Sequence, residues 1–121
     1  MGQLPRDRRI TRSKEIAALL AARRVRGPAL DLYWRPAAGP RSRAACTTPK
    51  FGRTIVQRNR LRRRLKSLTG EILLASGAPF DYLVRARPPA YEMDFDGLRA
   101  ALGELAGRVD APAADATPEG P

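Results

Sequence analysis

Hydrophobic residues recur at helical spacing in the middle of the chain. Leu61, Leu65 and Leu68 repeat every three or four positions, and Ile72 continues the series. Residues at this spacing lie on one face of a helix, so the pattern predicts a helix over residues 56–71. Its apolar stripe requires a core to pack against, whereas the remaining positions of the segment are mostly polar.

A second helical pattern lies near the N-terminus. Ser13 is a typical N-cap residue, and Ile16, Leu19 and Leu20 follow at positions that share one helical face. This predicts a short first helix that runs to about Arg24 and stops before a Gly-Pro pair.

A third pattern predicts a last helix that starts at Asp94 and continues through Leu98, Leu102 and Leu105. Gly107 follows as its stop signal. Because an acidic N-cap accepts the free amides of the first turn, we interpret the closely spaced Asp94 and Asp96 as helix-start residues rather than as a metal site.

Alternating patterns between these helices predict three strands. In residues 29–35, Leu30, Leu32 and Trp34 share one side, and Asp31, Tyr33 and Arg35 share a second side that we expect to face water. A short run of small residues over 43–48 and an alternating run over 80–87 follow.

The resulting order is helix, strand, strand, helix, strand, helix, with room for a further strand between residues 35 and 48. It predicts an α+β fold in which helices pack on a small mixed sheet. The segment from 43 to 87 forms a strand-helix-strand crossover, and the general rule for such units predicts a right-handed one.

The length of 121 residues accommodates a single domain. We place this domain at residues 13–108. Residues 1–12 are expected to form a basic N-terminal arm, and residues 109–121, rich in Ala, Pro and Asp, a disordered tail.

The segment of the central helix is also strongly basic. The chain has a net charge of +11, and all 23 of its Lys and Arg residues precede the tail. Residues 32–70 contain eleven Lys and Arg and no acid, whereas a helix that only needs solubility alternates the two signs. Twenty of the cations are Arg, whose planar guanidinium binds phosphate through two hydrogen bonds. This pattern indicates a surface that binds a polyanion.

Several classes of chemistry are excluded by composition. The chain has no His, which removes the commonest general base and imidazole metal sites, and its single Cys46 allows neither an internal disulfide nor a cysteine cluster for zinc. We interpret Cys46 as a small buried hydrophobic residue. The N-terminus lacks the apolar segment of a signal peptide, and no apolar run approaches the roughly 20 residues of a membrane span, so we expect a cytoplasmic protein.

The run Arg58-Asn59-Arg60-Leu61-Arg62-Arg63, followed by Leu65 and Glu71, resembles the signature helix of the bacterial ribonuclease P protein subunit. Four other segments resemble that family in the same order, over residues 4 to about 106. They are LPRDRRITRSKEIAALL, LDLYWRP, PKFGRTIVQRNR and DYLVRARPPA.

The resemblance implies a role in tRNA processing, as part of the endonuclease that removes the 5′ leader from precursor tRNA. In that family the RNA subunit is the catalyst and the protein binds RNA, which agrees with a sequence that has no general base. No catalytic residue is therefore assigned to the protein. The positions that match those contacting the catalytic RNA are Lys50, Arg53, Arg58, Asn59, Arg60, Arg62, Arg63 and Lys66.

The resemblance also implies a cleft for the single-stranded leader, with matching positions at Ile16, Leu20, Asp31 and Tyr33. The family often has aromatic residues at the first two, so Tyr33 is expected to be the main stacking platform. Asp31 would repel a phosphate if it faced the cleft. Further cations of the N-terminal region that we assign to RNA binding are Arg9, Arg12 and Lys14.

Three other expectations come with the resemblance. The crossover at the central helix is left-handed in this family, contrary to the general rule. Catalytic Mg²⁺ is expected to be organised by RNA phosphates, with no cofactor held by the protein. The partners are the catalytic RNA and precursor tRNA, with one protein monomer per RNA and no membrane.

Two alternatives to this function remain open from the residues alone. Small basic α+β domains also occur in ribosomal proteins and other nucleic-acid-binding proteins without a part in tRNA processing. A membrane-surface helix is the other, but the apolar stripe of residues 56–71 lacks an aromatic belt.

Overall fold

A computed structural model describes residues 6–76 and 79–109 of the chain. Four strands form one mixed sheet in the order β1-β2-β4-β3. Strand β2 runs antiparallel to both β1 and β4, and β3 runs parallel to β4 at the other edge. The strands are β1 (Arg23–Arg26), β2 (Leu30–Pro36), β3 (Arg43–Thr47) and β4 (Phe80–Ala86).

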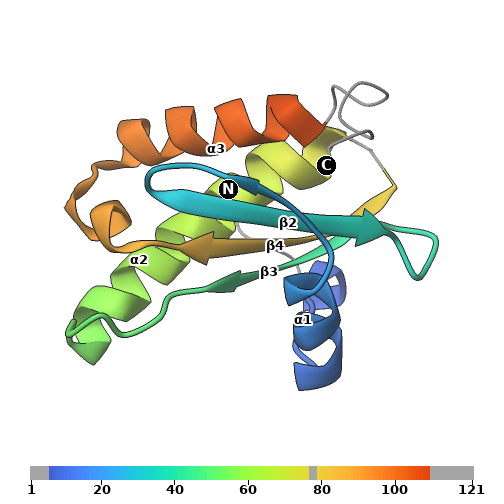
Figure 1. The fold of residues 1–121 in the computed structure, drawn as a ribbon, viewed down its shortest axis with the longest axis horizontal. Helices are drawn as coiled ribbons and strands as arrows, with labels where there is room; N and C mark the ends of the chain where they lie inside the picture. Colours follow the sequence, from blue (N-terminus) through green and yellow to red (C-terminus); the bar gives the residue numbers. More distant parts are fainter. Residues whose placement is uncertain (1–5, 77–78, 110–121) are drawn as a thin grey trace.

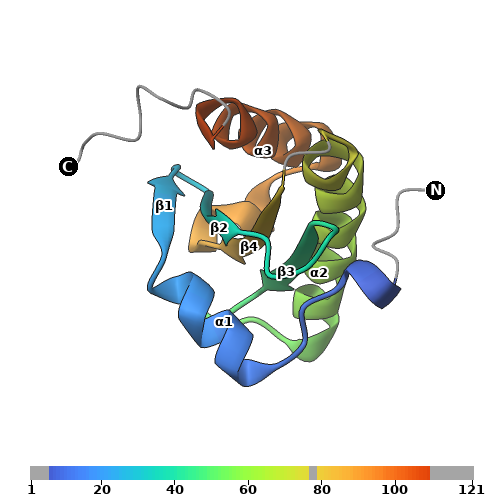
Figure 2. The same ribbon diagram turned by 90° about the vertical axis from the view of Figure 1, so that its right-hand side faces the viewer.

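Helices cover both faces of this sheet (Figures 1 and 2). The first helix, α1, lies on one face, and α2 and α3 lie on the other. The α-helices are α1 (Ser13–Leu20), α2 (Ile55–Leu68) and α3 (Phe95–Val109). Shorter helical segments are η1 (Arg6–Arg8), the π-helical turn η2 (Thr69–Leu73), η3 (Leu74–Ser76) and η4 (Pro88–Glu92). The predicted α+β class, with helices on a small mixed sheet, is confirmed.

The crossover from β3 through α2 to β4 is left-handed (Figure 2), as the family resemblance implied and contrary to the general rule. Consequently, α2 packs beside α3 on one face and leaves α1 alone on the other.

Each face of the sheet has its own hydrophobic core. Because side chains alternate along a strand, Leu32 and Trp34 enter the large core under α2 and α3, whereas Tyr33 enters a small core under α1. The prediction that Asp31 and Tyr33 face water is therefore wrong, since both are buried. The small core contains Ile10, Leu19, Tyr33, Ala45 and Leu83.

The first helix is shorter than predicted. It starts at Ser13, with Arg12 rather than Ser13 at the N-cap position, and it ends at Leu20. The chain then forms β1, which sequence analysis assigned partly to the helix. Residues 23–26 form a strand because they pair with β2, where Arg23 and Arg24 lie opposite Trp34 and Tyr33.

A tight turn at Gly27 joins β1 to β2. The Gly27 amide donates a hydrogen bond to the Leu30 carbonyl oxygen at 2.8 Å. A Cβ atom at this position would lie 3.0 Å from that oxygen and 3.3 Å from a methyl group of Leu105, so glycine permits the close approach of the turn to α3.

The last helix follows the prediction at its start but not at its end. The Gly97 amide donates to the Asp94 carboxylate at 2.8 Å, which confirms the capping role of Asp94. The helix then passes the predicted stop at Gly107 and reaches Val109, whose side chain is buried in the large core. Tertiary packing thus outweighs the low helix propensity of glycine.

The N-terminal residues from 6 to 10 lie along β3. Arg8 donates to the carbonyl and hydroxyl oxygens of Ser42 at 2.6 and 3.0 Å, and the Ile10 amide donates to the Ala44 carbonyl oxygen at 2.8 Å. Ile10 is buried in the small core. The proposed division into arm, domain and tail stays a prediction, and residues 1–5 and 110–121 lie outside the described residues.

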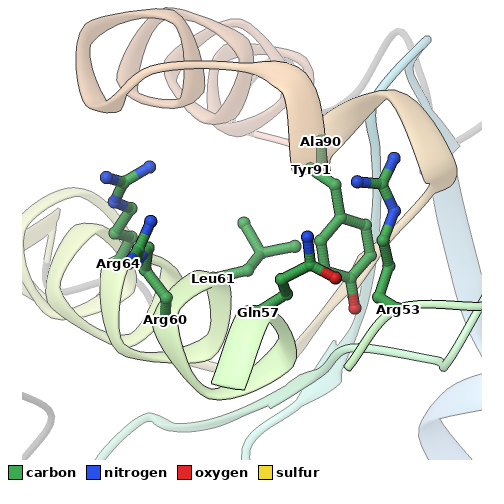
Figure 3. A pocket seen from close by; sticks show the side chains of 7 residues that line it. All are labelled: Arg53, Gln57, Arg60, Leu61, Arg64, Ala90 and Tyr91. Carbon is green, nitrogen blue, oxygen red and sulfur yellow. The ribbon is translucent and has the colours of Figure 1, made fainter. Parts of the chain in front are cut away.

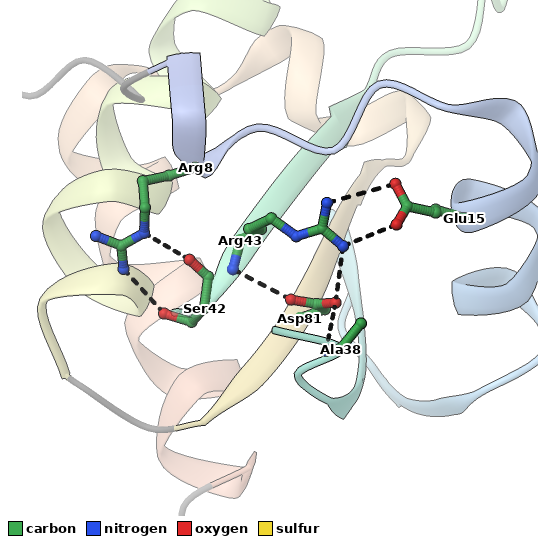
Figure 4. Close-up of polar contacts among 6 residues, drawn as sticks. All are labelled: Arg8, Glu15, Ala38, Ser42, Arg43 and Asp81. Atoms are coloured by element: carbon green, nitrogen blue, oxygen red, sulfur yellow. Dashed lines mark hydrogen bonds and ion pairs between the residues drawn. The ribbon is translucent and has the colours of Figure 1, made fainter. Parts of the chain in front are cut away.

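A polar network joins α1 to the end of the sheet (Figure 4). Arg43 donates to Glu15 at 2.8 Å and to Asp81 at 3.3 Å, and the Asp81 side chain is fully buried. Asp81 also accepts the backbone amides of Arg43 at 3.2 Å and of Ala38 at 3.4 Å. The guanidinium of Arg43 thus compensates a carboxylate that has no access to water.

We expect Arg43→Met to lower the free energy of unfolding by about 3 kcal/mol, because it leaves the Asp81 charge buried without its cation. Urea unfolding followed by circular dichroism measures this. Arg41→Met is the matched control, since the ion pair of Arg41 with Asp7 is exposed and its loss should cost less than about 1 kcal/mol. Equal effects of the two substitutions would contradict the role of Arg43.

The same network predicts a pH dependence. The hydrogen bond from Arg43 lowers the pKa of Glu15 below its usual value of 4.5. Because the pKa is lower in the folded state, the stabilisation is present above that value and is lost as pH falls through the folded pKa. Wild type should therefore exceed Glu15→Gln in unfolding free energy by about 0.5–1 kcal/mol near neutral pH. The difference should disappear in acid, and a difference independent of pH would refute it.

Candidate nucleic-acid interface

A tight loop and a capping box start helix α2. In the loop, Phe51 and Gly52 both have positive φ angles, of 46° and 76°. Thr54 then accepts the Gln57 amide at 3.1 Å, and the Gln57 side chain accepts the Thr54 amide at 2.9 Å. The predicted helix started at residue 56, one residue late, and the capping box was not identified, although the Thr-x-x-Gln spacing is its signal.

The inner face of α2 is the predicted leucine stripe. Leu61, Leu65 and Leu68 are buried in the large core, and Ile72 packs against it from η2. The α-helix covers residues 55–68 rather than 56–71, because the chain widens into a π turn at Thr69. The apolar prediction is confirmed for the three leucines, and their burial fixes which side of α2 faces outward.

One flank of α2 lies beside the chain that leaves β3. Arg62 donates to the Asn59 side chain at 2.9 Å and to the Thr48 hydroxyl at 3.2 Å. The Nε atom of Arg58 is buried and has no hydrogen-bond partner among the described residues. The two hydrogen bonds hold the Arg62 side chain against the protein, and both arginines are half-buried while Asn59 stays exposed.

The other flank of α2 borders a cavity closed by η4 (Figure 3). Arg53 and Tyr91 form one wall. The Arg53 guanidinium lies 4.9 Å from the centre of the Tyr91 ring and pairs with Glu92 at 2.6 Å. The cavity is lined by Arg53, Gln57, Arg60, Leu61, Arg64, Ala90 and Tyr91. Sequence analysis did not select Gln57, Arg64 or Tyr91 as site residues, because only the fold brings η4 beside α2.

The cations of α2 are largely uncompensated by acids. Of the eight positions predicted to contact catalytic RNA, Arg53 alone forms an ion pair with a described residue. The segment itself contains no acid. These eight positions come together on the loop and outer side of α2: Lys50, Arg53, Arg58, Asn59, Arg60, Arg62, Arg63 and Lys66.

The four predicted cleft residues lie near α1, but they differ in exposure. Leu20 is 46% exposed, whereas Tyr33 is 5% exposed and contributes to the small core. The Arg24 guanidinium lies 6.0 Å from the centre of the Tyr33 ring. Ile16 is half-buried at the edge of that core. Tyr33 therefore offers little ring surface to a base.

Asp31 is enclosed by cations. Its side chain is 3% exposed and lies 3.8 Å from both Arg26 and Arg87. Arg85 is its partner in the ladder between β2 and β4, so a third cation lies next to it on the same side of the sheet. These arginines were not among the predicted cleft residues, although Arg85 and Arg87 are two residues apart in the alternating run over 80–87 and so share one side of it.

The remaining predicted cations lie in the N-terminal region. Arg12 and Lys14 are exposed at the start of α1, and Arg9 forms a bridge with Ala44 of β3. Arg12 and Lys14 thus lie with α1, on the other face of the sheet from α2, whereas Arg9 lies at the β3 edge.

The described part of the chain shows neither a cluster of metal ligands nor an activated thiol. It contains no group of three or more His, Cys, Asp or Glu that could hold a metal ion. Burial raises the pKa of the Cys46 thiol to about 11, which agrees with the interpretation of Cys46 as an inert packing residue.

A family model described as ribonuclease P matches residues 4–110. The chain belongs to the ribonuclease P protein family. Among curated relatives, the ribonuclease P protein component of Xanthomonas campestris pv. campestris (strain B100) is 32% identical, over 95% of this chain and 80% of the relative. That of Xanthomonas euvesicatoria pv. vesicatoria (strain 85-10) is also 32% identical, over 95% of this chain and 81% of the relative.

Solved structures of ribonuclease P proteins share the fold. The Staphylococcus aureus protein superposes with a TM-score of 0.75 at 17% identity, covering 84% of this chain and 94% of that one. The Thermotoga maritima protein gives a TM-score of 0.69 at 19% identity, covering 83% and 96% of the two chains.

Family membership establishes the activity in which the chain takes part. It is the protein subunit of ribonuclease P, the endoribonuclease that matures the 5′ end of tRNA, and its partner is the ribonuclease P RNA. It is therefore an RNA-binding protein rather than a ribosomal or membrane-surface protein. Across residues 6–76 and 79–109, every helix is too short or too polar to span a membrane.

Proposed function

We propose that the outer side of α2 and the loop before it dock onto ribonuclease P RNA. The observation that carries this proposal is the set of exposed or half-exposed cations on α2 without acidic partners among the described residues. Phosphates of a folded RNA supply the missing negative charge, and arginine binds them bidentately.

The face of the sheet that carries α1 binds the 5′ leader of precursor tRNA in this proposal. Leu20, Ile16 and the exposed cations Arg12 and Lys14 contact the leader, while Arg26, Arg85 and Arg87 attract its phosphates around Asp31. The burial of Tyr33 supports a role beneath this surface, where it positions Arg24, rather than a role as the main stacking platform.

The left-handed crossover supports two RNA contacts on one small domain. It places α2 on the opposite face of the sheet from α1 (Figure 2). One protein monomer then binds the catalytic RNA through α2 and the leader through α1. We further propose a 1:1 complex in the cytoplasm.

Replacing Arg62 and Arg63 by alanine should weaken assembly of the chain with a bacterial ribonuclease P RNA. The logarithm of the association constant should also depend less steeply on the logarithm of salt concentration, by about one unit per lost phosphate contact. Filter binding over a salt series measures both quantities.

The matched control is Arg99→Ala with Arg108→Ala, which removes the same charge from α3, where both side chains already pair with acids. An identical loss of affinity in the control would show that net charge, and not the α2 surface, drives assembly.

Leu20→Asp should lower the affinity of the reconstituted holoenzyme for precursor tRNA by about tenfold, because it places a negative charge where the leader phosphates pass. Binding of mature tRNA, which lacks the leader, should be unchanged. Ala100→Asp on exposed α3 provides the control. If precursor and mature tRNA lose affinity equally, Leu20 does not contact the leader.

A further inference from the structure

We propose that the cavity between α2 and η4 binds one unstacked nucleotide of ribonuclease P RNA. Its base packs between Tyr91 and Leu61, and its phosphate lies between Arg60 and Arg64. This inference rests on the proposed docking of α2 onto that RNA and specifies a single nucleotide site within the interface.

The cavity has two unlike surfaces. Leu61 and Ala90 are buried at its apolar floor, and Tyr91 is half-buried at its wall. Figure 3 shows Arg60 and Arg64 on one side of the cavity, with Tyr91 and Arg53 on the other. An apolar slot with cations at its mouth matches a nucleotide, which joins a flat base to an anion.

The aromatic wall is fixed before any ligand arrives. The Tyr91 hydroxyl donates to the Pro49 carbonyl oxygen at 2.9 Å, and Glu92 holds the Arg53 guanidinium over the ring. In Figure 3, Arg53 lies on one side of the ring, and Gln57 and Leu61 lie on the other, which is the side that borders the cavity. Stacking of a base there would cost little side-chain entropy of Tyr91, because the ring is already held in position.

The two arginines at the mouth of the cavity favour the binding of an anion. Arg60 and Arg64 are one helical turn apart, and like charges at this spacing destabilise a helix. Neither forms an ion pair or hydrogen bond with a described residue, in contrast to Arg53 and Arg62. A phosphate between them would relieve the repulsion and accept hydrogen bonds from both.

The cavity is large enough to hold part of one base. Its volume is about 110 Å³, and it opens to solvent. A closed cavity of roughly 150 Å³ holds a benzene ring. The present cavity is smaller and open, so it would enclose only part of a base, and the sugar and phosphate would project from its mouth toward the arginines.

Titration of the full isotope-labelled chain with adenosine 5′-monophosphate or inorganic phosphate at constant ionic strength tests the site by NMR. The nucleotide should move the Tyr91 ring signals upfield, as stacking does, together with the side-chain signals of Arg60 and Arg64. Phosphate should move the arginine signals alone. Equal responses of Tyr91 to both probes, or none to either, would overturn the nucleotide site.

Arg60→Gln with Arg64→Gln should reduce the nucleotide response at Tyr91 at least about fivefold, because the phosphate contacts are lost. The control is Arg99→Gln with Arg108→Gln, which has the same net charge and should respond as wild type. Amide spectra of each variant show that it is folded. An undiminished response at Tyr91 in the Arg60 and Arg64 variant would overturn the proposed phosphate position.

Assembly measurements separate this inference from the docking proposal. If Arg58→Gln with Arg62→Gln weakens binding to ribonuclease P RNA but the nucleotide never reaches Tyr91, then α2 docks on RNA without a nucleotide in the cavity. If neither the Arg58 and Arg62 pair nor the Arg60 and Arg64 pair affects assembly, the docking proposal itself is wrong.

Discussion

Burial of the leucine stripe on α2 is the interaction on which the rest of the structure depends. The outer side of this helix carries arginines that repel one another, and no acid within the segment compensates them. Each like-charge pair one turn apart costs a few tenths of a kcal/mol, whereas burial of a leucine contributes about 2 kcal/mol. The buried Leu61, Leu65 and Leu68, helped by the capping box at Thr54, therefore hold a helix that its surface charge alone would destabilise.

The same burial links the fold to the activity of the ribonuclease P protein. Once the leucines face the sheet, the arginines necessarily face outward, because both sets repeat with the period of one helix. The left-handed crossover then places this surface beside α3, and η4 comes to lie against its flank. Tyr91 and Arg53, separated by a strand and a helix in sequence, thereby meet at one cavity. The protein positions cations beside the RNA. This agrees with a sequence that has no histidine to act as a general base.

Much of this fold could be predicted from the residues. Strands β2 and β4 and the stripes of α2 and α3 arise from local periodicity, and the structure contains these elements where they were expected. Other elements could not be predicted this way. Strand β1 consists of three arginines and one valine and has no pattern of its own, so only its pairing with β2 makes it a strand. Similarly, Asp31 and Tyr33 look like surface residues until α1 and the neighbouring arginines cover them.

The sequence by itself determined the basic helix, its inner and outer sides, the absence of a histidine base and the family, because each depends on residue type and short-range spacing. Tertiary structure alone decided which cations share a surface, which carboxylates are buried and where α2 meets η4. These features depend on contacts between segments far apart in the chain, for which local periodicity carries no signal. The exposed side of α2 could thus be predicted from its residues, whereas the cavity beside it exists only in the folded protein.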